Sequence, residues 1–152
     1  MILYHLEKWK YKDAWPPEGT LHAEGRWNKT GQWVIYTSPN IALAKLEILA
    51  NENNLPIKRV CLVIEVPDKT NIYKVELKDL PDNWMLMPYP AELTYHTVQF
   101  LNKGYLLMRV PSAQSKREFN YLINVRHPDF HKQVKLKDVF EEAFDKRLRK
   151  VP

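Results

Sequence analysis

Two side chains, Arg26 and Glu47, have the residue types and surroundings of a working site. Glu47 and Lys45 are the two charged residues between Ile41 and Ala50, so this carboxylate lies in an apolar stretch. A carboxylate that is buried needs a partner, and Arg26 is the obvious cation for that role. The pair is either a structural ion pair or part of a site that acts on a ligand, and these residues alone leave both alternatives open.

A hairpin is predicted to position Arg26. The segment Asn28 to Gly31 supplies turn residues between two aromatic-rich runs, which predicts a strand on either side of the turn. Arg26 would then lie within a residue or two of Val34 and Tyr36 on the neighbouring strand. We therefore expect a cation and an aromatic ring to share one patch of sheet.

A helix is predicted to position Glu47. Ser38 and Pro39 are a natural cap and first-turn proline for a helix that spans Ile41 to Ala50. A helix that is apolar nearly all round is expected to be buried. At 3.6 residues per turn, Glu47 shares a face with Leu43, Ala44, Ala50 and Asn51. The carboxylate is thus predicted to face inward over small side chains.

These residues belong to an ordered set of motifs that closely resembles the RES domain family, named after an Arg, a Glu and a Ser. The first half comprises Gly-Arg-Trp-Asn at 25–28, Gly31, Val-Ile-Tyr-Thr-Ser at 34–38, Ala-Leu-Ala at 42–44 and Leu46-Glu47. The second half comprises Val-Pro-Ser-Ala at 110–113, Asn120, Leu-Ile-Asn at 122–124, His-Pro-Asp-Phe at 127–130, Phe144-Asp145 and Arg147-Leu148. The resemblance covers nearly the whole chain and implies one RES domain over residues 1–152.

The resemblance implies both a fold and an activity. RES proteins are toxins of bacterial toxin–antitoxin pairs that degrade NAD⁺, on a fold similar to that of the ADP-ribosyltransferases. NAD⁺ would be the substrate of a phosphorylase or glycohydrolase, with inorganic phosphate or water as acceptor and no cofactor. A cognate antitoxin of the Xre type would be the partner and the link to nucleic acid, and a homo-oligomer is compatible with the family.

Three residues are expected to be catalytic if the resemblance holds. Glu47 would stabilise the oxocarbenium-like ribose and hold a ribose hydroxyl, because the departing nicotinamide needs no general acid. Arg26 would hold the phosphates of the dinucleotide with its planar fork of donors. Ser112 would orient the ribose or the incoming phosphate, and no Gly-x-Ser-x-Gly motif suggests a hydrolase nucleophile.

Substrate binding is assigned to Tyr36, Trp27 and Asn124. Tyr36 could stack on the nicotinamide ring, Trp27 adjoins Arg26, and Asn124 could form a hydrogen bond near the ribose. The chain departs from the family pattern where His5 follows Tyr4, since many members have an arginine there. That change removes one expected contact to an anionic ligand.

Length and composition agree with a single soluble domain. The chain has 152 residues, 45% hydrophobic and 27% charged, which is enough for one core. The start, Met1 to His5, lacks the features of a signal peptide, and the longest apolar runs are strand-sized, so a cytoplasmic protein is expected. Cys61 is predicted to be a small core residue rather than a nucleophile.

Two other functions stay open, and the net charge of +5 bears on one of them. Residues 132–150 contain seven basic and four acidic residues, a mixture most typical of a solvated face. If the resemblance misleads, the basic tail and interleaved aromatic residues favour a nucleic-acid-binding module or ribonuclease. If the resemblance holds, the same Arg26, Tyr36 and Glu47 would also serve an ADP-ribosyltransferase that modifies a protein. His127 and His131 are four residues apart, but Pro128 makes a continuous helix through them improbable, and no metal site is expected.

The remaining pattern predicts an α+β fold, because strands and helices are interleaved without regular alternation. Strands are expected at 59–66, 73–77, 105–110 and 120–125, and a helix over 93–101 should stop at Gly104. The segment Leu80 to Pro90 is expected to be a proline-rich surface loop, with packing of its aromatic residues on a pocket as the alternative. An amphipathic helix is predicted at 139–148.

Overall fold

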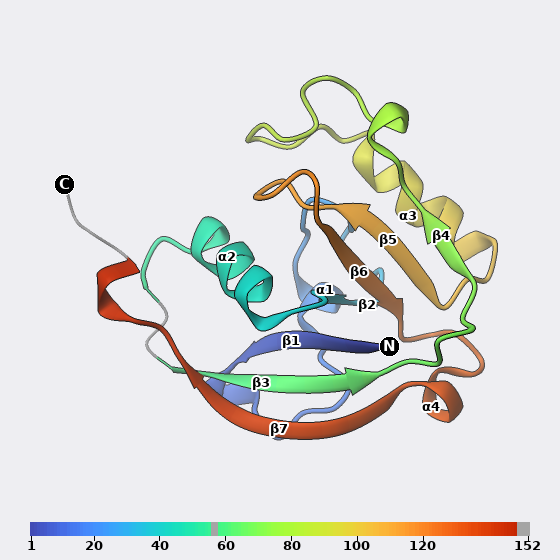
Figure 1. The fold of residues 1–152 in the computed structure, drawn as a ribbon. Helices are drawn as coiled ribbons and strands as arrows, with labels where there is room; N and C mark the ends of the chain where they lie inside the picture. The colour runs from blue at the N-terminus through green and yellow to red at the C-terminus, as the bar shows by residue number, and fades with distance from the viewer. Residues whose placement is uncertain (56–57, 149–152) are drawn as a thin grey trace.

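Two β-sheets form the frame of the molecule in the computed structural model, which describes residues 1–55 and 58–148 (Figure 1). The first sheet is antiparallel, in the order β1 (Ile2–Lys8), β3 (Lys58–Glu65) and β7 (Lys135–Ala143). The second has the order β2 (Val34–Thr37), β6 (Phe119–Asn124), β5 (Leu107–Pro111) and β4 (Ile72–Lys74). The β4–β5 pair is parallel, and the β2–β6 and β5–β6 pairs are antiparallel.

Short helices lie outside this frame. They are α1 (Gly19–His22), α2 (Ile41–Asn51), α3 (Leu93–Asn102) and α4 (Phe130–Gln133), with 3₁₀ turns η1 (Trp9–Tyr11), η2 (Leu77–Asp79) and η3 (Lys146–Leu148). Figure 1 shows α2 beside β1 and α3 outside the β4–β5 edge of the second sheet. The mixture of helices and antiparallel strands confirms the predicted α+β class.

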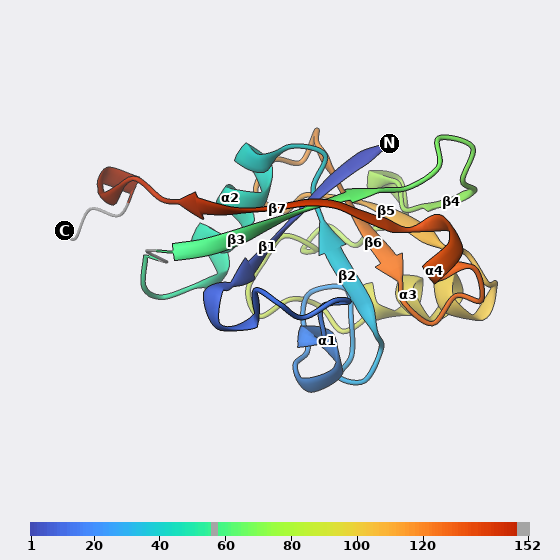
Figure 2. The ribbon, with the colours of Figure 1, turned by 90° about the horizontal axis from the view of Figure 1, so that it is seen from below.

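Side chains that alternate along the strands fill three layers of core. Leu62 and Ile123 belong to a cluster that draws on both sheets, whose strands cross in Figure 2. The next residue towards the N-terminus on each strand faces the other way: Cys61 packs with Ala44 of α2, and Leu122 packs with Phe100 of α3. Each helix therefore covers the outer face of one sheet.

Cys61 lies in the layer under α2 and is fully buried, as predicted for a core residue. Burial raises the pKa of its thiol to about 11, and the nearby Glu142 and Asp138 carboxylates add to the shift. A thiol with so high a pKa is a poor nucleophile at neutral pH.

The predicted hairpin around Asn28–Gly31 is wrong. A turn does form there, with Gln32 N donating to Lys29 O at 3.1 Å and Gly31 at φ +93°. However, β2 pairs with β6, and the segment that contains Arg26 is not a strand. The turn therefore forms as its residues predict, but β2 pairs with the distant strand β6 and not with the segment before the turn.

The helix that carries Glu47 forms as predicted, with a different cap and a different degree of burial. Asn40 is the N-cap, and its side chain accepts a hydrogen bond from Leu43 N at 2.8 Å. Leu43 and Ala44 are buried, whereas Leu46 is 41% exposed. The helix therefore covers the outer face of the first sheet with one side and leaves its other side exposed.

Two other predictions need correction. The tail expected to be helical over 139–148 is the strand β7 followed by η3, because pairing with β3 fixes its backbone in an extended conformation. The predicted strand at 73–77 is limited to β4, and η2 follows it. The strands β3, β5 and β6 and the helix α3 lie close to their expected positions, and Gly104 follows α3 with φ +73°.

Candidate active site

A cleft of about 440 Å³ opens between α2, the strands β1 and β2, and the loop that contains Met87 and Tyr89. This volume is in the usual range for a small-molecule pocket. Four of the six predicted site residues line it: Arg26, Trp27, Tyr36 and Glu47. Ser112 contacts the cleft through Glu47, and Asn124 does not line it.

Glu47 is held by two donors from the second sheet. Its Oε1 accepts hydrogen bonds from Ser112 Oγ at 2.5 Å and Asn120 Nδ2 at 2.7 Å. Ser112 follows the end of β5 and Asn120 lies on β6, so the donors come from neighbouring strands. Within the described part of the chain, no hydrogen bond reaches Oε2. One carboxylate oxygen is therefore fixed and the other remains open to a ligand.

Ser112 both caps a turn and holds the carboxylate. Its hydroxyl donates to Glu47 and accepts hydrogen bonds from the backbone N–H of Gln114 at 3.1 Å and of Ser115 at 3.2 Å. The side chain is 1% exposed. Two incoming N–H donors leave the hydroxyl proton for Glu47, which orients that hydrogen bond.

Arg26 is attached to the loop on the opposite side of the cleft. Its Nη1 donates to Trp84 O at 2.5 Å and Leu86 O at 3.3 Å, and its guanidinium lies 5.6 Å from the Tyr89 ring centroid. The predicted Arg26–Glu47 ion pair is not formed. The two charges influence each other only at a longer distance, without a direct contact between the guanidinium and the carboxylate. Burial lowers the pKa of Arg26, and the charge of Glu47 acts in the opposite direction.

The loop at 80–90 forms part of the cleft wall in addition to connecting η2 and α3. Trp84 is buried and packs on Trp27 with ring centroids 6.3 Å apart, while Tyr89 lines the cleft. Trp27 O also accepts a hydrogen bond from Thr97 Oγ1 of α3. Trp27 thus anchors one wall of the cleft, and only part of its surface faces the open space.

Tyr36 is held by the segment that carries Arg26. Its Oη donates to Asn28 Oδ1 at 2.7 Å and accepts from Trp27 N at 3.1 Å. Burial raises the pKa of Tyr36 further above neutral pH, so the phenol keeps the proton that it donates to Asn28. The ring lines the cleft at a fixed position, as stacking on a planar ligand would require.

Replacement of Gly25 by alanine is expected to disturb this wall. An added Cβ would lie 2.8 Å from both Tyr36 Oη and Asn28 Oδ1, which is closer than packing allows. We expect Gly25→Ala to lower the free energy of unfolding by about 1–3 kcal/mol, the usual cost of overpacking. Thermal and urea unfolding measure it. Gly19→Ala is the matched control, because nothing lies within 4 Å of a Cβ at that position; equal stability of the two variants would contradict the close contact.

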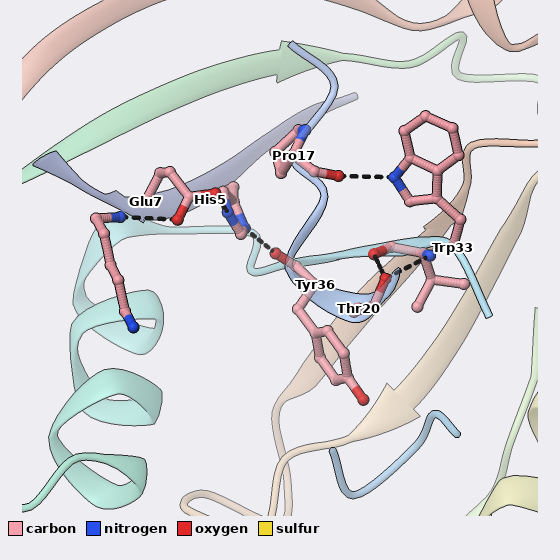
Figure 3. Close-up of polar contacts among 8 residues, drawn as sticks. His5, Glu7, Pro17, Thr20, Trp33 and Tyr36 are labelled. Carbon is pink, nitrogen blue, oxygen red and sulfur yellow. Dashed lines mark hydrogen bonds and ion pairs between the residues drawn. The ribbon is translucent and has the colours of Figure 1, made fainter. Parts of the chain in front are cut away.

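His5 joins β1 to β2 at the edge of the cleft. Figure 3 shows its ring between Glu7 and the backbone of Tyr36, with Nδ1 2.7 Å from Tyr36 O and Nε2 3.3 Å from Glu7 Oε2. Burial raises the pKa of Glu7, but the hydrogen bond and charge of His5, with smaller effects from the Lys8 backbone and Arg59, outweigh burial and the net shift is downward. His5 therefore supports the position of Tyr36 from behind.

Asn124 lies at the other end of the β2–β6 pair, opposite Val34. Its Nδ2 donates to Tyr105 O at 3.2 Å and its Oδ1 accepts from Arg126 N at 3.1 Å. The structure thus gives Asn124 a turn-stabilising position away from the cleft. Asn120, not Asn124, lies beside Glu47. Asn120 was part of the family motif, but the sequence does not show that its strand pairs with the one that ends before Ser112.

His127 forms part of a turn, where its Nδ1 accepts a hydrogen bond from Asp129 N at 3.0 Å. Across residues 1–55 and 58–148, His, Cys, Asp and Glu side chains do not gather in any group of three or more suited to a metal ion. Over the same residues, none of the helices has both the length and the apolar character of a membrane span.

Comparison with known proteins shows the family to which this chain belongs. The RES domain model matches residues 2–145. The chain belongs to the RES domain family. Its relatives include "Toxin Res" of Yersinia enterocolitica, 31% identical over 153 residues, with 98% of this chain and 100% of the relative covered. Another is the "Prs ADP-ribosylating toxin" of a Sphingobium species, 32% identical over 130 residues, covering 82% and 80%.

A solved structure extends the RES comparison to the fold. The Mycobacterium tuberculosis MbcT–MbcA toxin–antitoxin complex contains a chain that matches with a TM-score of 0.75 at 15% identity, over 93% of this chain and 84% of that one. In the RES domain described here, the arginine, glutamate and serine of the family name do not form one cluster. Ser112 binds Glu47, while Arg26 faces them from the opposite wall.

Proposed function

We propose that this RES protein is the toxin of a toxin–antitoxin pair and that it cleaves the nicotinamide–ribose bond of NAD⁺. The observation that carries the proposal is Glu47, a cleft-lining carboxylate with Oε1 fixed by Ser112 and Asn120 and with Oε2 free of hydrogen bonds from described residues. A charge held in this way is preorganised to stabilise a cation that forms beside it.

The proposed reaction needs that kind of group. The bond between C1 of the ribose and the pyridinium nitrogen breaks, its electron pair stays with the nitrogen, and neutral nicotinamide leaves without protonation. The ribose then has oxocarbenium character, which Glu47 stabilises electrostatically. Phosphate or water forms the new bond to C1 and releases a proton, giving a phosphorylated ADP-ribose or free ADP-ribose.

The other walls of the cleft suit the rest of the dinucleotide. Tyr36 offers a fixed aromatic ring for the nicotinamide, and Arg26 offers a half-buried guanidinium for the phosphates. Arg26 binds two loop carbonyls in this structure, so a phosphate would either share the guanidinium with them or displace them. Ser112 acts through Glu47 rather than by attack on the substrate.

The direct test is incubation of the purified protein with NAD⁺, with and without inorganic phosphate, and identification of the products by mass spectrometry. Release of nicotinamide supports the proposal. A phosphorylated ADP-ribose that appears only with phosphate identifies a phosphorylase, and ADP-ribose in both samples identifies a glycohydrolase. NAD⁺ that stays intact in all samples contradicts the proposed function.

A second candidate function is transfer of ADP-ribose to a protein. The relative from Sphingobium is named an ADP-ribosylating toxin, and the same Arg26, Tyr36 and Glu47 would serve that reaction. Labelled NAD⁺ distinguishes the two candidates when it is added to a bacterial lysate. Label on a protein band favours transfer, and label confined to small products favours NAD⁺ degradation.

Expression of this chain alone is expected to stop the growth of a bacterial host, and cellular NAD⁺ should fall before viability does. Co-expression of a cognate antitoxin, for which we propose an Xre-type protein, should restore growth by covering the cleft. Growth curves with timed NAD⁺ measurements test both parts. Growth that stops while NAD⁺ stays constant would favour protein modification or an action on nucleic acid.

A further inference from the structure

We propose that Asn120 is a positioning residue for Glu47 and that Ser38 in turn fixes the Asn120 amide. The proposal rests on the proposed function for its substrate, because Glu47 is the group that would act on NAD⁺. It adds two residues for which the sequence offered no chemical role. Ser38 had the pattern of a helix cap, and Asn120 appeared only as one letter of a motif.

Three side chains form a chain of hydrogen bonds that ends at the carboxylate. Ser38 Oγ donates to Asn120 Oδ1 at 2.7 Å, and Asn120 Nδ2 donates to Glu47 Oε1 at 2.7 Å. Ser38 is 3% exposed, and Asn120 is half-buried and lines the cleft. Both hydrogen bonds are therefore partly shielded from water. Each is electrostatically stronger in this environment than it would be at the surface.

The chemistry of the three groups permits one orientation of the amide. An ionised carboxylate only accepts hydrogen bonds, so the NH₂ group of Asn120 must face Glu47. The amide oxygen then faces Ser38, whose hydroxyl must donate. Removal of the Ser38 hydroxyl would leave that oxygen without its donor and free the amide to rotate away from the carboxylate.

The backbone explains why Ser38 is a firm anchor. Ser38 and Tyr4 exchange two backbone hydrogen bonds, Tyr4 N to Ser38 O at 2.8 Å and Ser38 N to Tyr4 O at 2.9 Å. This bridge joins the two sheets where β2 ends. Asn120 lies opposite Val110 on the adjacent strand, two residues before Ser112. The register thus delivers both donors to the same oxygen of Glu47, with the second sheet as a rigid support.

The kinetic test compares Asn120→Ala, Ser38→Ala and a control. We expect kcat for NAD⁺ cleavage to fall on the order of 10- to 100-fold in Asn120→Ala, the effect of losing a hydrogen bond to a charged group, with KM within about threefold. Ser38→Ala should show a smaller fall of the same kind. An unchanged kcat in Asn120→Ala would overturn the proposal.

Thr20→Val is the matched control for lost stability. The Thr20 hydroxyl donates to Val34 O at 2.9 Å and accepts from Val34 N at 3.0 Å, so it also holds the backbone of β2, but outside the cleft (Figure 3). This variant should unfold at a lower temperature and keep the wild-type kcat. If kcat falls equally in Thr20→Val and Asn120→Ala, the Asn120 effect is general destabilisation and the positioning role is wrong.

Asn120→Asp provides a readout that a purely structural role would not change. A second carboxylate beside Glu47 repels it when both are ionised, and one shared proton restores a donor. The kcat of this variant should therefore rise relative to the wild type as the pH is lowered, while Arg26, the cation that interacts with Glu47, stays protonated throughout. A profile parallel to that of the wild type would count against the proposal.

Crystal structures separate this inference from the proposed function. If the wild type does not cleave NAD⁺, the proposed function fails, and the positioning role is judged on the Glu47 side chain alone. The Glu47 side chain should move away from Ser112 or adopt several conformations in Asn120→Ala, and it should stay fixed in Thr20→Val. An unmoved, fully ordered Glu47 in Asn120→Ala would overturn the inference even if the wild type is active.

Discussion

Glu47→Gln is expected to fold like the wild type and to lose NAD⁺ cleavage by a factor on the order of 100, since a preorganised electrostatic group contributes roughly 3 kcal/mol to the transition state. Glutamine keeps an oxygen that can accept the hydrogen bonds from Ser112 and Asn120, so the local geometry is preserved. The substitution removes the negative charge that would stabilise the positive charge on the ribose in the transition state. The rate of nicotinamide release, with the melting temperature of the same sample, measures the effect.

Glu142→Gln is the control for Glu47→Gln. Glu142 of β7 pairs at 2.6 Å with Lys45, which lies on α2 like Glu47, and it does not line the cleft. This change also neutralises a carboxylate that contacts α2, and it should leave turnover within about twofold, because the half-buried pair lies outside the cleft. Wild-type turnover in Glu47→Gln would show that its charge is not used. In cells, that variant should also be harmless at an expression level where the wild type stops growth.

Arg26→Lys is expected to weaken NAD⁺ cleavage by about tenfold or more in kcat/KM, although the positive charge is kept. In this structure Nη1 alone donates to both loop carbonyls. An ammonium group has a single nitrogen and lacks the planar fork that would hold a phosphate with two parallel hydrogen bonds. Steady-state kinetics and calorimetric titration with NAD⁺ measure the change. If affinity and turnover both stay at wild-type values, Arg26 is a structural anchor of the loop at 84–89 and has no part in binding.

Arg109→Lys is the matched control for Arg26→Lys. Arg109 is also half-buried and also lies over an aromatic ring, 4.2 Å from the Phe119 centroid, with Glu76 as its ion-pair partner at 3.1 Å. It does not line the cleft. We expect this variant to lose some stability and to keep kcat/KM, so the comparison isolates the position of Arg26 from the general cost of replacing an arginine.

The sequence by itself determined the local elements whose signals are short-range. Continuous apolar residues predicted β3, and helical spacing that stops at a glycine predicted α3, because burial pattern and backbone preference act within a few residues. The same reasoning failed at 139–148, where apolar side chains occur at helical spacing but pairing with β3 imposes a strand. Local patterns singled out Arg26 and Glu47, and the family resemblance added Ser112, which its own surroundings did not mark.

Only the tertiary structure decided which of these residues meet. The hydrogen bonds to Glu47 come from residues 65 and 73 positions further along the chain, and no periodicity in the sequence encodes such a distance. The choice of Ser112 and Asn120 over Arg26 follows from strand order, because β2 pairs with β6 and not with its sequence neighbour. The sequence determined which side chains are present. The register of the β5–β6 pair decided that the donors from Ser112 and Asn120 meet at one oxygen of Glu47.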